Sequence, residues 1–80
     1  MIDVKTAVKV AADYLSSLVS AYNTRLEEVE LTEDGDYWLI TLSYDTKPSP
    51  LPFELRSYKQ LRLNRQTGDV LAMKIRTLQQ

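Results

Sequence analysis

The chain has 80 residues, 44% of them hydrophobic, with 10 Lys and Arg against 11 Asp and Glu. This length allows one domain with one core, and the composition is that of a globular protein rather than a disordered one. There is no cysteine and no histidine, which excludes disulfides, thiolate nucleophiles and cysteine zinc sites, and removes the commonest general base.

No stretch approaches the ~18 consecutive apolar residues that a transmembrane helix needs. The first residues also lack the basic segment and unbroken apolar run of a signal peptide, since Lys9 and Asp13 interrupt the apolar pattern. We therefore expect a cytoplasmic protein that does not associate with membranes.

Residues 3–22 have the periodicity of an amphipathic helix. Apolar side chains recur there at alternating steps of four and three residues, which places them on one stripe: Val4, Val8, Ala11, Leu15, Leu18 and Tyr22. Asp3 is suited to cap the first turn, because its carboxylate can accept from free backbone amides. Asn23 is the expected end of the helix, because asparagine tolerates the left-handed conformation.

After Asn23 the period changes from 3.6 to 2, which predicts a hairpin of strands at 27–33 and 37–45. Gly35 can adopt a positive φ in the turn between them. On the second strand Trp38 is in phase with the apolar positions, and we expect it to pack in the core.

All three prolines, Pro48, Pro50 and Pro52, lie in a predicted loop at 46–54. Each proline removes a backbone donor, so this segment cannot be a central strand. A connection within the domain is the favoured interpretation, and a ligand for an SH3-like groove is the alternative.

Two further strands are predicted at 55–65 and 69–78, with a turn around Gly68 between them. Their inward positions are expected to be Leu61 and Leu63, followed by Leu71, Met73 and Ile75. Short connections make neighbouring strands antiparallel. The sequence thus predicts a single α+β domain, in which one N-terminal helix packs on a four-stranded antiparallel meander sheet.

One helix covers only one face of such a sheet, and the other face is predicted to grade from acidic to basic. Residues 1–45 carry a net charge of −6, from three cations and nine anions, and residues 46–80 carry +5, from seven cations and two anions. Attraction between the two halves of one fold is the favoured interpretation of this split, and a binding face is the alternative. This open face, or an edge strand, is the predicted binding surface for an unidentified protein partner, and its acidic and basic sides also fit a homodimer. The candidate partner-binding residues are Arg56, Tyr58, Arg62, Lys74 and Arg76.

Single-stranded nucleic-acid binding by the last two strands is the alternative, because basic residues beside an aromatic side chain occur in such proteins. The acidic overall balance and the single aromatic among the cations argue against it. No catalytic spacing and no phosphate-binding glycine loop is present, and the acidic segment around Gly35 is too short for a calcium loop. We expect a non-enzyme without a cofactor or metal, with a carboxylate-and-metal enzyme as the remaining hypothesis.

The segment from Tyr58 to Leu71, with its Thr67-Gly68-Asp69-Val70 turn, resembles the end of a PepSY domain. Asn64 stands where that family usually has aspartate, and the proline loop is an insertion. The glycine turn and aromatic strand are also similar to those of gas-vesicle accessory proteins. The PepSY resemblance implies a non-catalytic module that binds or restrains a protein partner, often a peptidase, in a secreted or membrane-attached setting.

Overall fold

A computed structural model describes residues 1–46 and 56–76 of the chain. It contains one helix, α1 (Val4–Leu18), and four strands, β1 (Tyr22–Leu31), β2 (Tyr37–Asp45), β3 (Ser57–Asn64) and β4 (Val70–Ile75). The strands form one antiparallel sheet in the order β1-β2-β3-β4. The predicted fold class, one helix on a four-stranded antiparallel meander, is confirmed.

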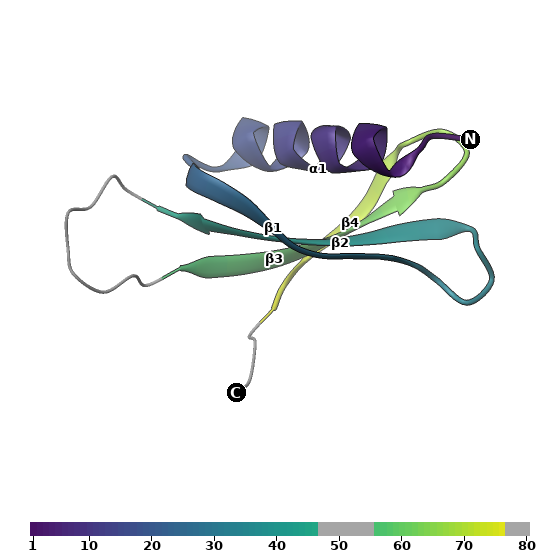
Figure 1. The fold of residues 1–80 in the computed structure, drawn as a ribbon. Coiled ribbons are helices and arrows are strands. Elements are labelled where there is room, and N and C mark those ends of the chain that lie inside the picture. The colour runs from purple at the N-terminus through teal and green to yellow at the C-terminus, as the bar shows by residue number, and fades with distance from the viewer. Residues whose placement is uncertain (47–55, 77–80) are drawn as a thin grey trace.

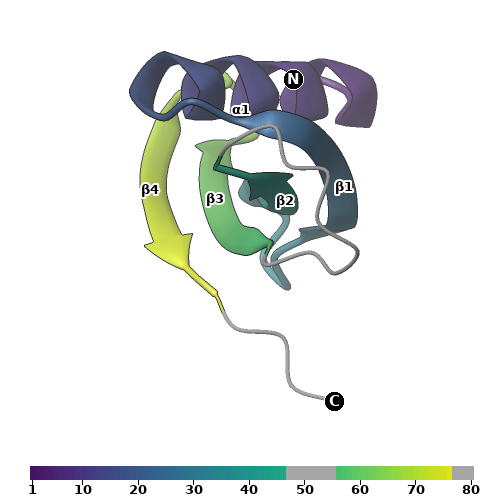
Figure 2. The same cartoon turned by 90° about the vertical axis from the view of Figure 1, so that its left-hand side faces the viewer.

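The helix lies across one face of the sheet (Figure 1), and the end-on view places β1 and β4 at its flanks (Figure 2). Its stripe of Ala7, Ala11 and Leu15 is fully buried. The sheet contributes the rest of the buried core, which consists of Ile40, Leu42, Tyr44, Leu61 and Leu63. Removal of this apolar surface from water is the main force that holds the two layers together.

Hydrogen bonds of Ile2 and Asp3 hold the N-terminal segment in place. Asp3 caps the helix as expected, accepting from the Thr6 amide at 2.8 Å. The Ile2 amide donates to the Arg65 carbonyl at 2.9 Å, and the Trp38 indole donates to the Ile2 carbonyl at 3.4 Å. Trp38 is half-buried and packs against the core, as its phase predicts.

The predicted end of the helix is wrong. α1 ends at Leu18, four residues before the predicted limit, and Val19 is already extended. The spacing of Leu18 and Tyr22 continues the helical stripe by coincidence, since Tyr22 begins β1. Asn23 does adopt the left-handed conformation, with φ of 53°, but beside an irregularity of β1 instead of at a helix end.

The limits of β1, β3 and β4 also differ from the predicted ones. β1 begins five residues earlier than the predicted 27–33, because its first half is exposed on both faces and carries no alternation of polar and apolar residues. β3 and β4 are shorter than the predicted 55–65 and 69–78. The predicted proline loop lies almost wholly outside the described residues.

The predicted inward positions hold on β3 but not throughout β4. Leu61 and Leu63 are buried, and Met73 packs against the core, whereas Leu71 and Ile75 are exposed. Arg62 pairs with Ala72 but Leu63 pairs with Val70, so Leu71 is an extra residue in a bulge of β4. The bulge shifts the alternation of inward and outward side chains, and Val70 packs against the core in the place expected for Leu71. Ile75 lies opposite Lys59 at the end of β4, away from the core cluster.

Candidate functional site: the open face and the edges of the sheet

The central strand β2 is buried on both faces, although the helix covers only one. Ile40, Leu42 and Tyr44 face the core under α1, and Thr41 and Ser43, which point the other way, are equally inaccessible. A buried hydroxyl costs free energy unless it is hydrogen-bonded. The open face must therefore supply both a cover and hydrogen-bond partners for these two side chains.

Arg56 covers Ser43. Its guanidinium donates from Nε to the Ser43 hydroxyl at 3.0 Å, from Nη1 to the Asp45 carboxylate at 3.3 Å and from Nη2 to the Asn23 carbonyl. Ser43 in turn donates to the Glu27 carboxylate at 2.6 Å. Because only 6% of the Arg56 side chain is exposed, this cluster is a buried polar network that ties the start of β3 to β2 and β1.

Arg76 covers Thr41. Its Nη1 lies 2.9 Å from the Thr41 hydroxyl and 2.6 Å from the Glu28 carboxylate. The side chain therefore reaches from the end of β4 across β3 and β2 to β1, the opposite edge of the sheet. This ion pair is more open than the first, with 34% of the arginine and 52% of the glutamate side chain exposed.

The remaining predicted partner-binding residues lie on the same face. Arg62 is exposed and sits over the Tyr37 ring, 5.1 Å from its centre, and Tyr58 is half-buried. Arg62 and Lys74 border a small hollow of about 80 Å³ together with Leu39, Gln60 and Ala72. The structure thus brings Arg62 and Lys74 together, while Arg56 and Arg76 bind carboxylates within the sheet. The binding role of these five residues stays a prediction.

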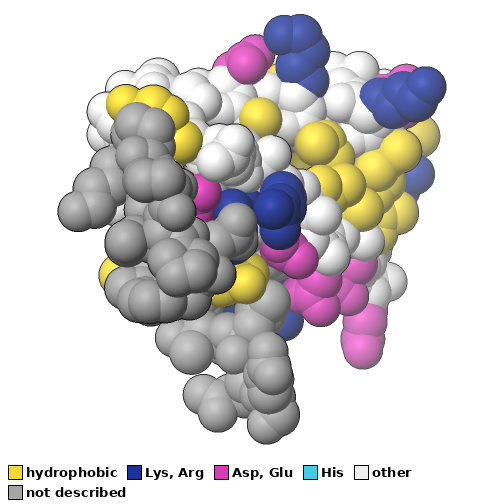
Figure 3. Space-filling view, turned by 60° about the vertical axis from the view of Figure 1, so that its left-hand side comes forward, with side chains coloured by type: hydrophobic (Ala, Val, Ile, Leu, Met, Phe, Trp, Pro, Cys, Tyr) yellow, Lys and Arg dark blue, Asp and Glu magenta, His cyan; other side chains and the backbone are white. Residues whose placement is uncertain are grey.

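Apolar side chains are exposed mainly beside the sheet edges. Val4, Lys5 and Val8 of α1 form an open groove of about 290 Å³ with Leu26 of β1. Leu26 is 47% exposed although it lies on the helix side of the sheet, because β1 is an edge strand. Figure 3 shows a continuous apolar surface at the right of the molecule, with basic side chains above it and acidic side chains below. Sequence periodicity placed Val4 and Val8 on the core stripe of the helix and left Leu26 outside the predicted strand 27–33, so it missed this surface.

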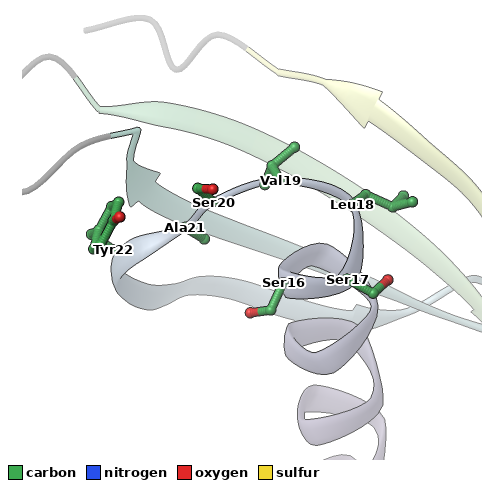
Figure 4. A pocket seen from close by; sticks show the side chains of 7 residues that line it. All are labelled: Ser16, Ser17, Leu18, Val19, Ser20, Ala21 and Tyr22. Carbon is green, nitrogen blue, oxygen red and sulfur yellow. The ribbon is translucent and has the colours of Figure 1, made fainter.

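A second hollow, of about 440 Å³, lies where α1 passes into β1 and is lined by consecutive residues from Ser16 to Tyr22. The hydroxyls of Ser16 and Ser17 point away from each other (Figure 4). The Ser17 hydroxyl donates to the Tyr14 carbonyl of its own helix. These side chains do not converge on one point, so the hollow has no polar cluster that would orient a ligand.

Two carboxylates have shifted titration, and both belong to local turns. A hydrogen bond from the Thr6 amide lowers the pKa of Asp3 below its ordinary value of 3.8. The Thr32 hydroxyl, followed by the Asp36 amide, lowers the pKa of Asp34 in the β1–β2 turn. Stabilised ionised carboxylates are typical of caps and turns, whereas a general acid needs a raised pKa.

Within residues 1–46 and 56–76, no group of three metal-ligating side chains converges. No helix in that part of the chain has the length and apolar character needed to cross a membrane. Comparisons of the chain with protein-family models, with curated proteins and with solved structures find no match.

Proposed function

We propose that the protein is a small, non-catalytic protein-binding or regulatory module, similar to a PepSY domain, that acts mainly through an edge of its sheet. The observation that carries this proposal is the acidic β1 edge beside an apolar groove. Extended segments add to exposed sheet edges through backbone hydrogen bonds, and side-chain pockets beside the edge supply specificity. β1 offers both features, since its outer side is unpaired in the described structure and Leu26 and Val4 are exposed next to it.

The open face is less favoured than the β1 edge as the binding surface. Arg56 and Arg76 bind Asp45 and Glu28, and these contacts use charges that a partner would otherwise meet. The same contacts weigh against single-stranded nucleic acid, for which free cations and free aromatic faces supply the binding. Arg62 already stacks on Tyr37.

Affinity capture from a lysate of the source cells, with and without nuclease, tests the proposal. The two matched baits are Glu30→Lys, on the edge strand β1, and Arg62→Glu, two strands away on β3. Both side chains lie on the open side of the sheet, so the pair separates the β1 edge from the centre of the open face. Each bait reverses one exposed charge that has no ion pair among the described residues. We expect one protein that wild type and Arg62→Glu capture under both conditions and that Glu30→Lys loses.

The other outcomes each point to a different function. Loss with Arg62→Glu alone would move the binding surface to the open face. Capture that disappears after nuclease treatment would favour the nucleic-acid alternative. Identical capture by all three baits would overturn the proposal that either surface binds a partner.

A further inference from the structure

On the outer edge of β1, the backbone N–H and C=O groups that point away from β2 belong to residues whose side chains lie on the helix side of the sheet. The Thr32 amide donates to the Tyr37 carbonyl, which fixes the alternation of the antiparallel ladder. In this register Glu28 and Glu30 are bonded to β2, so the N–H and C=O groups of Val29 and Leu31 point outward. The β1 edge, residues 28–31, is therefore a short template for another strand.

The outer edge of β4 has the same construction. The Arg76 amide donates to the Tyr58 carbonyl, so Lys74 is bonded to β3 and the backbone groups of Met73 and Ile75 point outward. The Ile75 side chain is 80% exposed. The β4 edge, residues 73–76, thus alternates apolar side chains on the helix side with cations on the open face.

The charges on the two edges decide which edges can pair between copies. β1 against β1 places Glu30 opposite Glu30 in its central register, and β4 against β4 places Lys74 opposite Lys74. Like charges directly opposite one another destabilise a strand pair, whereas opposite charges stabilise it. Only the pairing of β1 with β4 opposes unlike charges.

We propose that the partner is a second copy of this chain, whose β4 edge pairs antiparallel with the β1 edge of the first. Glu30 lies opposite Lys74 of the neighbouring copy, whereas Glu28 and Arg76 keep the ion pair that they form within each copy. On the helix side, Val29 lies opposite Ile75 of the neighbouring copy. This register satisfies the outward backbone groups of both edges and leaves the helices of both copies on the same face of a continuous sheet.

The proposed contact is heterologous, so a pair of copies keeps one free β1 edge and one free β4 edge. Repetition then produces a ring if the rotation closes and an open filament if it does not. The inference rests on the proposed function, because it identifies the occupant of the β1 edge. It also accounts for an exposed isoleucine on an edge strand, which a monomer leaves in water.

Sedimentation velocity of the purified chain over a range of concentrations at low salt tests the inference by charge reversal. Wild type is expected to self-associate, and Glu30→Lys or Lys74→Glu alone to weaken association about tenfold, since each replaces an attraction with a repulsion. The double variant Glu30→Lys/Lys74→Glu restores the unlike pair and is expected to associate like wild type. An equimolar mixture of the two single variants is expected to do the same.

Three results would overturn the inference. Wild type that stays monomeric at millimolar concentration has no such contact. Association that neither reversal changes uses another surface. A mixture of Glu30→Lys and wild type that associates more strongly than wild type by itself indicates β1 against β1. Ile75→Lys provides a check that does not depend on charge reversal. It places a charge on the β4 edge without disturbing the core, and it is expected to abolish association. A monomer whose lysate capture still depends on Glu30 would refute self-association while the proposed function stands.

Discussion

The two faces of β2 are buried to the same degree by different means. On one face a helix covers Ile40 and Leu42, and on the other two arginine side chains lie over Thr41 and Ser43. The apolar face is stabilised by area removed from water, which does not depend on direction. The polar face depends on each hydrogen bond, because a buried hydroxyl or carboxylate left without its partner costs free energy. A two-layer domain can therefore protect its central strand with long side chains in place of a third layer.

Truncation on the apolar face is expected to have the largest effect. Leu61→Ala removes buried methyl groups beneath α1 and should lower the free energy of unfolding by about 2 to 5 kcal/mol. Denaturant unfolding followed by circular dichroism measures this loss. The matched control Leu61→Met keeps the volume and should cost less than about 1.5 kcal/mol. Equal losses in the two variants would mean that side-chain volume is not what stabilises this face.

Truncation on the polar face comes next. Arg56→Ala leaves the Ser43 hydroxyl without its donor and leaves Asp45 with the Asn23 amide alone, in a site that water barely reaches. It should lower the free energy of unfolding by about 2 to 3 kcal/mol. Burial also shields the pair, so this loss should change little between low and high salt. The same denaturant titrations measure both quantities.

Two controls separate geometry from charge at this position. Arg56→Lys keeps the charge but not the planar set of donors, and should recover only part of the loss. Arg62→Ala removes an exposed arginine from the same face and should cost well under about 1 kcal/mol. If Arg62→Ala proved as costly as Arg56→Ala, burial would not distinguish the two arginines.

The second arginine should contribute less because water reaches it. Arg76→Ala is expected to lower the free energy of unfolding by about 0.5 to 1 kcal/mol, with a clear decrease of that loss at high salt. Lys9→Ala is the exposed reference, since 76% of its side chain and 69% of that of its partner Asp13 are accessible, and should cost less than about 0.5 kcal/mol. A loss of unfolding free energy in Arg76→Ala that salt does not change would show that the Arg76 ion pair is as well shielded from water as that of Arg56.

Acid is expected to weaken the two local turns that Asp3 and Asp34 stabilise. The pKa values of Asp3 and Asp34 are lowered in the folded state, so their contribution to stability is present above pH 3.8 and is lost as pH falls through the folded-state values. Asp34→Asn keeps an acceptor for Thr32 but cannot titrate, so its melting temperature should fall less steeply between pH 3.8 and about pH 2. Parallel melting-temperature profiles for wild type and Asp34→Asn would contradict this assignment.

Periodicity was sufficient to predict the layers of this fold. The stripe on α1, the alternation on β2 and the Gly35 and Gly68 turns each follow local rules that leave a trace in the sequence. The early end of α1 leaves no such trace, because Leu18 and Tyr22 have helical spacing on either side of it. The bulge that exposes Leu71 is equally invisible, since it depends on how β3 and β4 pair.

For the candidate site, the sequence predicted only the side of the sheet on which the residues lie, and not the contacts that they make. Alternation placed the five residues predicted to bind a partner on the open side of the sheet. Which of them contact carboxylates depends on the register between strands that are distant in the sequence. Arg76 and Glu28 are 48 positions apart and meet only because β4 and β1 flank the same two strands. The exposed groove beside Leu26 likewise depends on where α1 lies over the sheet.

The backbone bond between Ile2 and Arg65 has a consequence for the order in which the protein can fold during synthesis. α1 is made first, yet its buried stripe packs against a core that includes Leu61 and Leu63. A ribosome-bound chain therefore carries an amphipathic helix with no complete surface to dock on until β3 has been made. Such late closure of distant contacts slows folding and leaves apolar surface open to chaperones in the interval.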